Sequence, residues 1–324
     1  MPRRGERTIE VISHGPSCLD GVMAAAAVRR FYQGLRVRAT LAANGESDRV
    51  LQELKPRTTG GCDEIWITDL SWTSRETADH LNALVQDGTQ LFWIDHHRTA
   101  VSRSEAPEFR VAFAGRVLSE DYSAAKLTFN FLRQREGSSS EDPSWSYQNF
   151  QPFVELADDH DRWLHRIPGS ADWALAVQTL GGIESYREII RLREPVMSRR
   201  LKAALEVGRT AMSKSLEVAN ATLVERLLDN GLRVRSACCI GYSSEVAARL
   251  YEGQNRTIIA LFDLRSLGVS LRRSADCRVD LSELARQFGG GGHPAAAGFA
   301  VDELKRAPAE LLAQLLGERL ERNA

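Results

Sequence analysis

Residues 90–97 read QLFWIDHH, an apolar run of strand-forming residues that ends in an aspartate and two histidines. Two earlier segments follow the same plan, since TIEVIS at 8–13 is followed by His14 and EIWIT at 64–68 is followed by Asp69. Amphipathic stretches separate these runs, so strands and helices alternate along the chain. This alternation predicts an α/β fold in which a doubly wound, mostly parallel sheet forms the first domain.

Five strands and two long helices are predicted in this domain. The strands are β-branched or aromatic runs bounded by polar turns, and they lie at Thr8–Ser13, Arg36–Ala42, Glu64–Thr68, Gln90–Ile94 and Phe109–Phe113. The helices have apolar residues at three- and four-residue spacing, and they lie at Val22–Tyr32 and Arg75–Gln86. Thr73 and Glu76 stand at the spacing of a capping box and mark the start of the second helix.

The length of 324 residues predicts two domains. We assign residues 1–185 to the first domain, 186–229 to a helical connector interrupted only by Pro195, and 230–324 to a second, smaller α/β domain. Asn230-Gly231 ends the connector. The further elements expected are a polar loop at Gly137–Pro143, strands at Thr257–Phe262 and Gly268–Leu271, a Gly-rich loop, and a C-terminal helix from about Val301.

Composition argues against several classes of protein. No apolar run approaches the roughly 18 residues that span a bilayer, and no signal peptide is evident, so we expect a soluble, cytoplasmic protein. The five cysteines form no CxxC pair, which disfavours a disulfide framework or a zinc ribbon. A net charge of −1 gives no general attraction to polyanions, so long duplex nucleic acid is not expected as the main partner.

Carboxylate and imidazole side chains follow three of the predicted strands. His14 and Asp20 follow the first strand, Asp69 follows the third, and Asp95-His96-His97 stand at the end of the fourth. Because the carboxyl ends of parallel strands form one crevice, we expect these residues to converge. Crowded carboxylates need cations to neutralise them. Oxygen and imidazole ligands favour Mn²⁺ or Mg²⁺ over structural zinc, and two such ions support hydrolysis of a phosphoester.

Each of these residues also has an ordinary structural explanation. A lone aspartate after a strand, such as Asp69, is usually a helix cap or a turn residue. His96 and His97 are adjacent and point in different directions, so at most one of them would bind a given ion. The convergence of several such residues at strand ends favours the metal site over these explanations.

The segment Gly289–Gly292 combines four glycines with His293. Glycines let the backbone approach an anion closely and direct N–H groups toward it, and the histidine adds a donor. Arg272, on the preceding predicted strand, is a second candidate for contact with a terminal phosphate. The alternatives are a turn that ends a helix around Leu284 and a surface salt bridge made by Arg272.

Five segments resemble motifs of the DHH phosphoesterase superfamily, which includes RecJ-type exonucleases, nanoRNases and pAp phosphatases. WIDHH at 93–97 resembles the motif that names the family, SHGPSCLDG at 13–21 the first motif, and WITDLS at 66–71 the second. LADDHDRW at 156–163 is the match to the fourth motif, a lone aspartate. FGGGGHPAAAGF at 288–299 resembles the signature of the DHH-associated substrate-binding domain. Motifs in this order span nearly the whole chain.

The resemblance implies a role for each candidate residue. The implied metal ligands are His14, Cys18, Asp20, Asp69, His96 and Asp159, with Asp69 shared between two ions. Asp158 and Asp161 are the alternatives to Asp159. The implied catalytic residues are Asp95, which would orient a histidine, together with His97 and Arg98. The implied substrate-binding residues are Arg272, Gly291, Gly292 and His293.

Cys18 departs from the family pattern, which has an aspartate at this position of the first motif. As a thiolate, Cys18 would favour a softer ion such as Zn²⁺ or Fe²⁺ in that site, and otherwise it is a small buried residue. Mn²⁺ at two sites is the expected cofactor, with Mg²⁺, Zn²⁺ and Fe²⁺ as alternatives. The tryptophans, Trp163 among them, are expected in the core or at its rim, and base stacking is their less favoured role.

The resemblance therefore implies a metal-dependent phosphoesterase that hydrolyses short single-stranded oligonucleotides or nucleotide phosphates such as pAp, with a homodimer left open. The alternatives are a hydrolase of polyphosphate or of linear or cyclic dinucleotides, and a catalytically weak DHH module that only binds its ligand.

Overall fold

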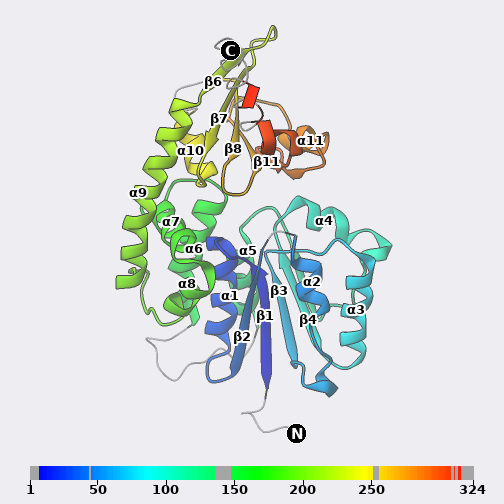
Figure 1. Ribbon diagram of the computed structural model, residues 1–324. Coiled ribbons are helices and arrows are strands. Elements are labelled where there is room, and N and C mark those ends of the chain that lie inside the picture. The colour runs from blue at the N-terminus through cyan, green and yellow to red at the C-terminus, as the bar shows by residue number, and fades with distance from the viewer. Residues whose placement is uncertain are drawn as a thin grey trace. The chain divides into compact units, whose positions relative to one another are not determined.

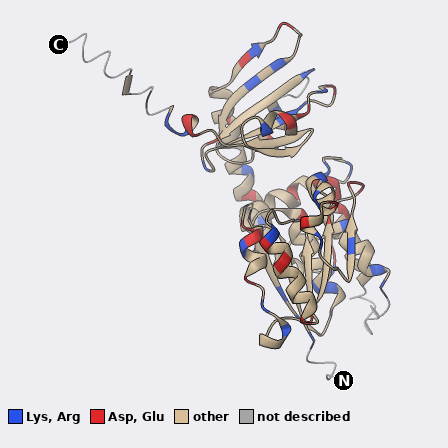
Figure 2. Cartoon of the chain, turned by 90° about the vertical axis from the view of Figure 1, so that its right-hand side faces the viewer, with Lys and Arg blue, Asp and Glu red and all other residues tan. Residues whose placement is uncertain are grey.

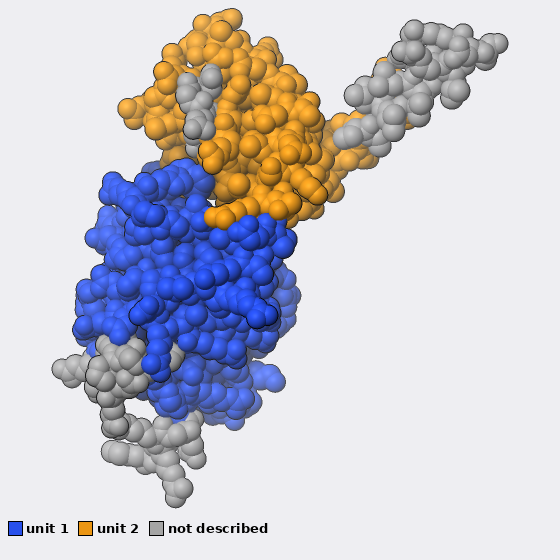
Figure 3. Space-filling view, turned by 90° about the vertical axis from the view of Figure 1, so that its left-hand side faces the viewer, with its two compact units in different colours: residues 1–208 blue, residues 209–324 orange. Residues whose placement is uncertain are grey.

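The computed structural model describes residues 7–43, 45–135, 147–250, 255–307, 310, 313 and 314. The chain divides into two compact units, Met1–Gly208 and Arg209–Ala324, which Figure 3 colours separately. The loop predicted at Gly137–Pro143 lies outside the described residues. Basic and acidic residues are interspersed along the elements of both units (Figure 2), in keeping with the net charge of −1.

The first unit is built on a five-stranded parallel sheet with the order β2-β1-β3-β4-β5 (Figure 1). Its strands are β1 (Thr8–His14), β2 (Arg36–Ala42), β3 (Glu64–Thr68), β4 (Gln90–Asp95) and β5 (Gly115–Leu118). The chain runs from β1 outward to β2 and then returns to the other side of β1 for β3. The direction of winding therefore reverses between β1 and β3, and a crevice opens at their carboxyl ends.

Helices cover both faces of this sheet (Figure 1). One face carries α1 (Leu19–Phe31), α5 (Ala124–Arg133), α6 (Gln151–Asp161), α7 (Ser170–Leu180) and α8 (Gly182–Ile189). The other face carries α2 (Ser47–Gln52), α3 (Arg75–Gln86) and α4 (Arg98–Ser104). The core under the second group includes Leu51, Ile67, Trp72, Leu81 and Trp93, each at most 1% exposed. The predicted doubly wound fold class is confirmed.

Two local predictions in this unit are wrong. The fifth strand is Gly115–Leu118 rather than Phe109–Phe113. The phenylalanines at both ends of the predicted segment instead pack against the core: Phe109 ends a short 3-10 turn, and Phe113 follows it. Helix α3 has the predicted bounds, but its N-cap is Ser74, whose Oγ accepts the N–H of Thr77, rather than Thr73.

The second unit contains a six-stranded mixed sheet with the order β10-β11-β9-β8-β7-β6. Its strands are β6 (Val224–Leu227), β7 (Arg233–Cys239), β8 (Thr257–Asp263), β9 (Gly268–Arg273), β10 (Gly291–His293) and β11 (Ala296–Phe299). Helix α10 (Ser243–Leu250) packs on β8 and β9, and α11 (Leu281–Arg286) packs on β9, β10 and β11. Leu271 and Ala297 on the sheet meet Leu281 and Ala285 of α11 in a small core.

The connector predicted at 186–229 is only partly helical. Helix α8 ends at Ile189, and α9 occupies Arg199–Ala221. Residues Val224–Leu227 are a strand that pairs with β7, and Asn230-Gly231 lies in the turn of that hairpin instead of ending a helix. Pairing with β7 outweighs the helix propensity of this segment, which is the reason the prediction fails here.

The Gly-rich segment is a hairpin rather than an open loop. Gly291 lies opposite Gly298, and His293 lies opposite Ala296. A Cβ atom at Gly290 would stand 2.1 Å from the carbonyl oxygen of Gly298, so the fold itself requires glycine there. In the predicted C-terminal helix, the described residues 302–307, 310, 313 and 314 are helical. Among the described residues, no helix is both long and apolar enough to cross a membrane.

Candidate metal centre

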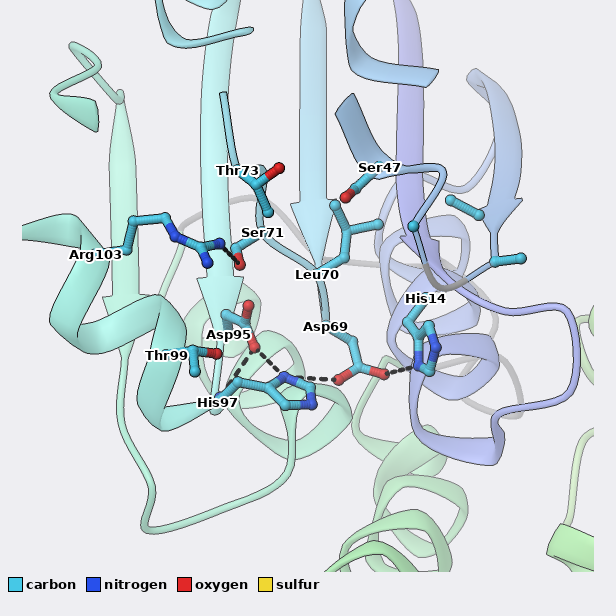
Figure 4. Close-up of a pocket in the computed structure, with 13 residues that line it drawn as sticks. His14, Ser47, Asp69, Leu70, Ser71, Thr73, Asp95, His97, Thr99 and Arg103 are labelled. Carbon is cyan, nitrogen blue, oxygen red and sulfur yellow. Dashed lines mark hydrogen bonds and ion pairs between the residues drawn. The ribbon is translucent and has the colours of Figure 1, made fainter. Parts of the chain in front are cut away.

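The predicted site residues of the first unit gather at the carboxyl ends of three adjacent strands. His14 is the last residue of β1, Asp69 directly follows β3, and Asp95 ends β4 before His96 and His97. These strands are neighbours in the sheet, so the side chains that follow them meet in one crevice. Figure 4 shows His14 and His97 on either side of the Asp69 carboxylate.

Asp69 lies at the middle of the cluster. Its backbone is left-handed, with a φ of +56°, and its N–H donates to the carbonyl of Ile94 on the neighbouring strand. The carboxylate is almost fully buried. One oxygen lies 3.5 Å from His14 Nδ1, and the other lies 3.4 Å from His96 Nε2 and 3.8 Å from His97 Nδ1. A carboxylate flanked by imidazoles on both sides is suited to being shared by two ions.

His96 brings two further carboxylates into the cluster. Its Nε2 lies 3.8 Å from an oxygen of Asp20 and 3.5 Å from an oxygen of Asp161. The oxygens of Asp20 also accept the backbone N–H groups of Ala124 and Ala125, at 2.8 and 2.9 Å, at the start of α5. A helix N-terminus stabilises the negative charge of such a carboxylate and fixes its orientation.

Three overlapping groups of side chains are placed to hold a metal ion. The groups are His14 with Cys18 and Asp69, Asp69 with His96 and His97, and Asp20 with His96 and Asp161. Within each group the candidate ligand atoms lie within 4.8 Å of one another. Because Asp69 and His96 each belong to two groups, the three groups form one continuous cluster.

Burial and crowded negative charge shift the pKa values of the cluster. Burial, and then the charges of Asp69 and Asp161, raise the pKa of Asp20 to about 8. Burial opposes ionisation of Asp69 as well, but hydrogen bonds with His14 and His96 outweigh it and lower the pKa of Asp69. Burial would lower the pKa of His96, yet its hydrogen bond with Asp69 and the nearby carboxylates raise it to about 10. Divalent cations fit this set, since its oxygen and imidazole donors are those that Mn²⁺ and Mg²⁺ accept.

Asp95 is buried and orients the two histidines that follow it. One of its oxygens accepts the backbone N–H groups of His96 and His97, at 2.7 and 3.1 Å, and lies 2.7 Å from His97 Nδ1. The other oxygen is buried without a hydrogen-bond partner in the described part of the chain. This is the orienting position that the sequence assigns to Asp95, because a carboxylate on one ring nitrogen fixes the tautomer and the direction of the other.

A pocket opens beside the cluster and is bounded by His14, Asp69, Asp95 and His97 on one side (Figure 4). Its remaining wall combines small or apolar residues with hydroxyl side chains and one arginine. The first group is Ala42, Ala43, Gly45 and Leu70, and the second is Ser47, Ser71, Thr73, Thr99 and Arg103. Arg103 donates from Nη1 to Ser71 Oγ at 3.0 Å and to the carbonyl of Trp72 at 2.5 Å.

The predicted phosphate-contacting Arg98 is exposed in the first turn of α4 and is not one of the residues that line this pocket. Arg103, one and a half turns further along α4, lines it instead. The sequence offers no signal that separates these two arginines, apart from the bounds of the short helix that carries both.

Asp159, the preferred fourth-motif ligand, does not reach the cluster. Its oxygens accept the N–H of Arg166 at 2.7 Å and the hydroxyl of Ser170 at 2.6 Å. Asp161 takes the predicted place, and Asp158 accepts the N–H of Ser123 at 2.8 Å. Two residues along an α-helix correspond to a rotation of about 200°, so Asp159 and Asp161 point to opposite sides of α6 and only one can face the cluster.

Cys18 joins the cluster at the start of α1. Its Sγ lies 3.6 Å from an oxygen of Asp69, and the thiol is the donor in that contact. Burial raises the pKa of the Cys18 thiol well above its usual value, and the charges of Asp69, Asp161 and Asp20 raise it further. The thiol therefore keeps its proton unless a cation takes the proton's place.

The second unit places Arg272 and His293 on one face of its sheet. Arg272 of β9 lies opposite Ala296 of β11, which in turn lies opposite His293 of β10. Residues directly opposite one another point to the same face, so the small Ala296 side chain separates the arginine from the histidine. Arg272 donates to Ser244 Oγ at 2.6 Å and to the carbonyl of Leu271 at 2.8 Å, which fixes the guanidinium.

Gly291 and Gly292 differ in what the fold requires of them. A Cβ at Gly292 would stand 2.5 Å from the carbonyl oxygen of Ala296, and the φ of Gly292 is +141°. A Cβ at Gly291 would enter open space, and no unusual φ requires glycine at this position. The fold therefore explains the glycine at 292 but not the one at 291, which is exposed.

Comparison with known proteins identifies relatives of this chain. The model of the DHHA1 domain matches residues 241–321. Oligoribonuclease NrnB of Bacillus subtilis (strain 168) is 27% identical over 256 residues, which cover 74% of this chain and 60% of the relative. This chain thus spans less than two thirds of that curated protein.

Solved structures with little sequence identity share the fold. RecJ from Thermus thermophilus in complex with Mn²⁺ has a TM-score of 0.53 and 17% identity, over 94% of this chain and 50% of RecJ. The pGpG-specific phosphodiesterase PggH from Vibrio cholerae has a TM-score of 0.50 and 14% identity, over 96% of this chain and 99% of PggH.

Proposed function

We propose that the chain is a member of the DHH phosphoesterase superfamily and a metal-dependent hydrolase of phosphoester bonds in short oligonucleotides or small nucleotide phosphates. The match of the DHHA1 domain to residues 241–321 and the 27% identity with oligoribonuclease NrnB support this proposal. The observation that carries this proposal is the buried cluster around Asp69 and His96, where imidazoles and carboxylates approach to 3.4–3.8 Å. Cations bound here would neutralise the buried carboxylates, and the same cations would attract the negative oxygens of a phosphate.

Two groups of side chains would hold the ions. His14, Cys18 and Asp69 form one group, Asp20, His96 and Asp161 form the other, and His96 Nε2 lies 3.4 Å from Asp69. When bound, a pair of divalent ions activates water for attack on phosphorus and neutralises the negative charge of the phosphate. Mn²⁺ is the ion that we propose first, because oxygen and nitrogen donors predominate in the cluster. The RecJ structure with a similar fold contains Mn²⁺.

His97 is the proposed phosphate contact. Its ring is held by Asp95 at Nδ1 and is 36% exposed where it lines the pocket. An imidazole fixed in this way can donate to a phosphate oxygen as negative charge develops there. The hydroxyl groups of Ser71 and Thr73, with Arg103 behind them, fit the sugar and phosphate oxygens of the rest of the substrate.

The second unit is proposed to bind the terminal phosphate of the substrate. Arg272 and His293 stand on the same sheet face with only Ala296 between them, and the exposed backbone of Gly291 adjoins them. A fixed guanidinium, an imidazole and an uncovered backbone together supply the donors that a phosphate monoester needs. Such contacts would act on binding and orientation, whereas the metal cluster would act on the chemical step.

A substrate screen tests the proposal. The purified full chain, freed of metal and reloaded with Mn²⁺, Mg²⁺, Zn²⁺ or Fe²⁺, would be assayed on pAp, on dinucleotides, on RNA of two to five nucleotides, on cyclic dinucleotides and on polyphosphate. We expect hydrolysis of the short linear nucleotides, greatest with Mn²⁺ and abolished by chelation. Full activity after exhaustive chelation, or no hydrolysis with any ion, would overturn the proposal. Preference for polyphosphate would replace the substrate class.

A further inference from the structure

Trp163 differs from the other tryptophans that the structure describes. Trp66, Trp72, Trp93 and Trp173 are core residues, exposed by 0%, 1%, 1% and 4%. Trp163 is only partly buried. A large aromatic ring that remains in contact with water represents apolar area that the fold does not use.

The chain holds Trp163 next to the metal cluster. Asp161, whose carboxylate lies 3.5 Å from His96 Nε2, is the last residue of α6, and Trp163 follows two residues later. Two trans peptide units span at most about 7.6 Å, so the Cα atom of Trp163 is within that distance of the Cα atom of Asp161. The backbone that carries the indole therefore lies close to a proposed metal ligand.

The backbone at Trp163 is strained and firmly fixed. Trp163 and His165 have φ values of +56° and +53°, which bulky residues rarely adopt and which cost on the order of 1–3 kcal/mol each. Asp159 holds this turn, because its carboxylate accepts the N–H of Arg166 and the hydroxyl of Ser170, and its carbonyl accepts the N–H of Leu164 at 2.8 Å. Asp159 therefore stabilises this turn, although its carboxylate does not face the metal cluster.

Two imidazoles fix the position of the indole. The ring of His165 meets it nearly at right angles, with centroids 4.5 Å apart, and the ring of His160 lies 5.6 Å away on a tilted plane. The exposed side chain of Arg166 adds positive charge to the same turn, whereas Arg162 forms an ion pair with Asp158 at 3.7 Å. An aromatic ring held beside basic groups matches what single-stranded nucleic acids require, since a base stacks on the ring while its backbone meets the cations.

We propose that Trp163 is a stacking platform for a nucleobase of the substrate, and that it makes the site selective for nucleotides over phosphoesters without a base. This inference rests on the proposed function, because it assigns a substrate part to the same site. Stacking of one base typically contributes enough to alter binding about five- to hundredfold.

The test compares variants that differ only in the ring. Trp163→Phe keeps an aromatic face, whereas the matched control Trp163→Leu keeps an apolar side chain without one. Each would be assayed in the full chain with Mn²⁺ on the dinucleotide pApA and on the same diester with both bases replaced by hydrogen. We expect Trp163→Leu to lower kcat/KM on pApA about five- to hundredfold and on the base-free diester by no more than about twofold, with Trp163→Phe close to wild type.

A binding measurement makes the result independent of turnover. Calorimetric titration with AMP and with ribose 5-phosphate should give a clear preference for AMP in the wild type and in Trp163→Phe, and no preference in Trp163→Leu. Equal losses on both diesters, or an unchanged preference for AMP in Trp163→Leu, would overturn the stacking role. A wild-type chain that hydrolyses no phosphoester overturns the proposed function instead, and the AMP comparison still decides whether Trp163 binds a base.

Discussion

The two proposed binding sites are constructed in opposite ways. In the first unit, ionisable side chains from three strand ends are gathered below the surface, and Asp20 and Asp69 are at most 2% exposed. In the second unit, the hairpin of β10 and β11 depends on glycines that leave room for close backbone approach, and Gly291 is exposed. Substitutions in the first site should therefore alter the chemical step, and those in the second should alter substrate binding.

The largest effect is expected where a ligand is shared. Asp69→Asn keeps the size of the side chain but removes the charge that faces His14 and His96, and His96→Ala removes the ring that contacts three carboxylates. Either change should lower kcat by two to three orders of magnitude or more, about 3–4 kcal/mol of transition-state stabilisation. Steady-state kinetics with Mn²⁺ and metal analysis of the purified variants check this. Near wild-type turnover in either variant would contradict the role of the cluster.

Two aspartates on α6 provide a sharper comparison within the first unit. Asp161→Asn should reduce kcat at least tenfold with little change in Tm, because Asp161 faces His96 and is 25% exposed. Asp159→Asn should instead lower the free energy of unfolding by about 1.5–3 kcal/mol, because it weakens charge-assisted hydrogen bonds to Arg166 and Ser170. Thermal unfolding and kcat on bis-p-nitrophenyl phosphate, measured on both variants, separate the two roles. The reverse pattern would restore Asp159 as the metal ligand.

This pair also shows how far sequence reasoning reaches. The motif LADDHDRW identifies the helix turn that carries the proposed ligand, because carboxylates crowd there. Selecting Asp161 over Asp159 requires the rotation of α6 about its axis, which is set by packing against α1, α5 and α7. The strand ends that carry His14, Asp69 and His96 needed no such information, since every parallel strand delivers its next residues to the same edge.

The same distinction explains the errors in the fold. Arg36–Ala42, Glu64–Thr68 and Arg75–Gln86 have the predicted bounds because local periodicity and burial agree there. Phe109–Phe113 is apolar because it covers the core from outside the sheet, a role that leaves the same composition as a strand. The hairpin at Gly291–Phe299 consists mainly of glycines and alanines, which have little strand propensity, and its pairing with β9 makes it part of the sheet.

In the second unit, the effects should depend on the kind of substrate. Arg272→Ala and His293→Ala should lower kcat/KM on two- to five-nucleotide substrates about ten- to hundredfold, since a charge-assisted phosphate contact is worth roughly 1.5–3 kcal/mol. Hydrolysis of bis-p-nitrophenyl phosphate should stay largely intact. Arg272→Lys is the matched control, because it keeps the charge and loses the fork of donors.

A glycine pair separates substrate contact from folding in the same hairpin. Gly291→Ala places its methyl group in open space, so it should leave Tm unchanged while lowering kcat/KM on the nucleotides. Gly290→Ala meets the carbonyl of Gly298 and should destabilise the unit.

Equal proportional losses of activity on the nucleotide and on the artificial ester in the Arg272 and His293 variants would make the hairpin part of the catalytic centre. No loss on either substrate would make it a structural turn.

The smallest effect is expected at Cys18, where the first unit departs from an all-carboxylate and imidazole ligand set. Its Sγ lies 3.6 Å from Asp69, and burial among carboxylates raises the pKa of the thiol, so sulfur becomes a ligand only if an ion displaces its proton.

If sulfur ligates, the chain loaded with Co²⁺ should show a sulfur-to-metal charge-transfer absorption that Cys18→Ser abolishes. Cys18→Asp should retain activity within a few-fold and raise the activity with Mn²⁺ relative to that with Zn²⁺, because a carboxylate is a harder ligand than a thiolate. Each of the other cysteines remains in both variants, which ties any spectral change to this one sulfur. Identical Co²⁺ spectra for the wild type and Cys18→Ser, with the same order of metals in Cys18→Asp, would show that the thiol only packs beside Asp69 and that the first ion is held by His14 and Asp69 without it.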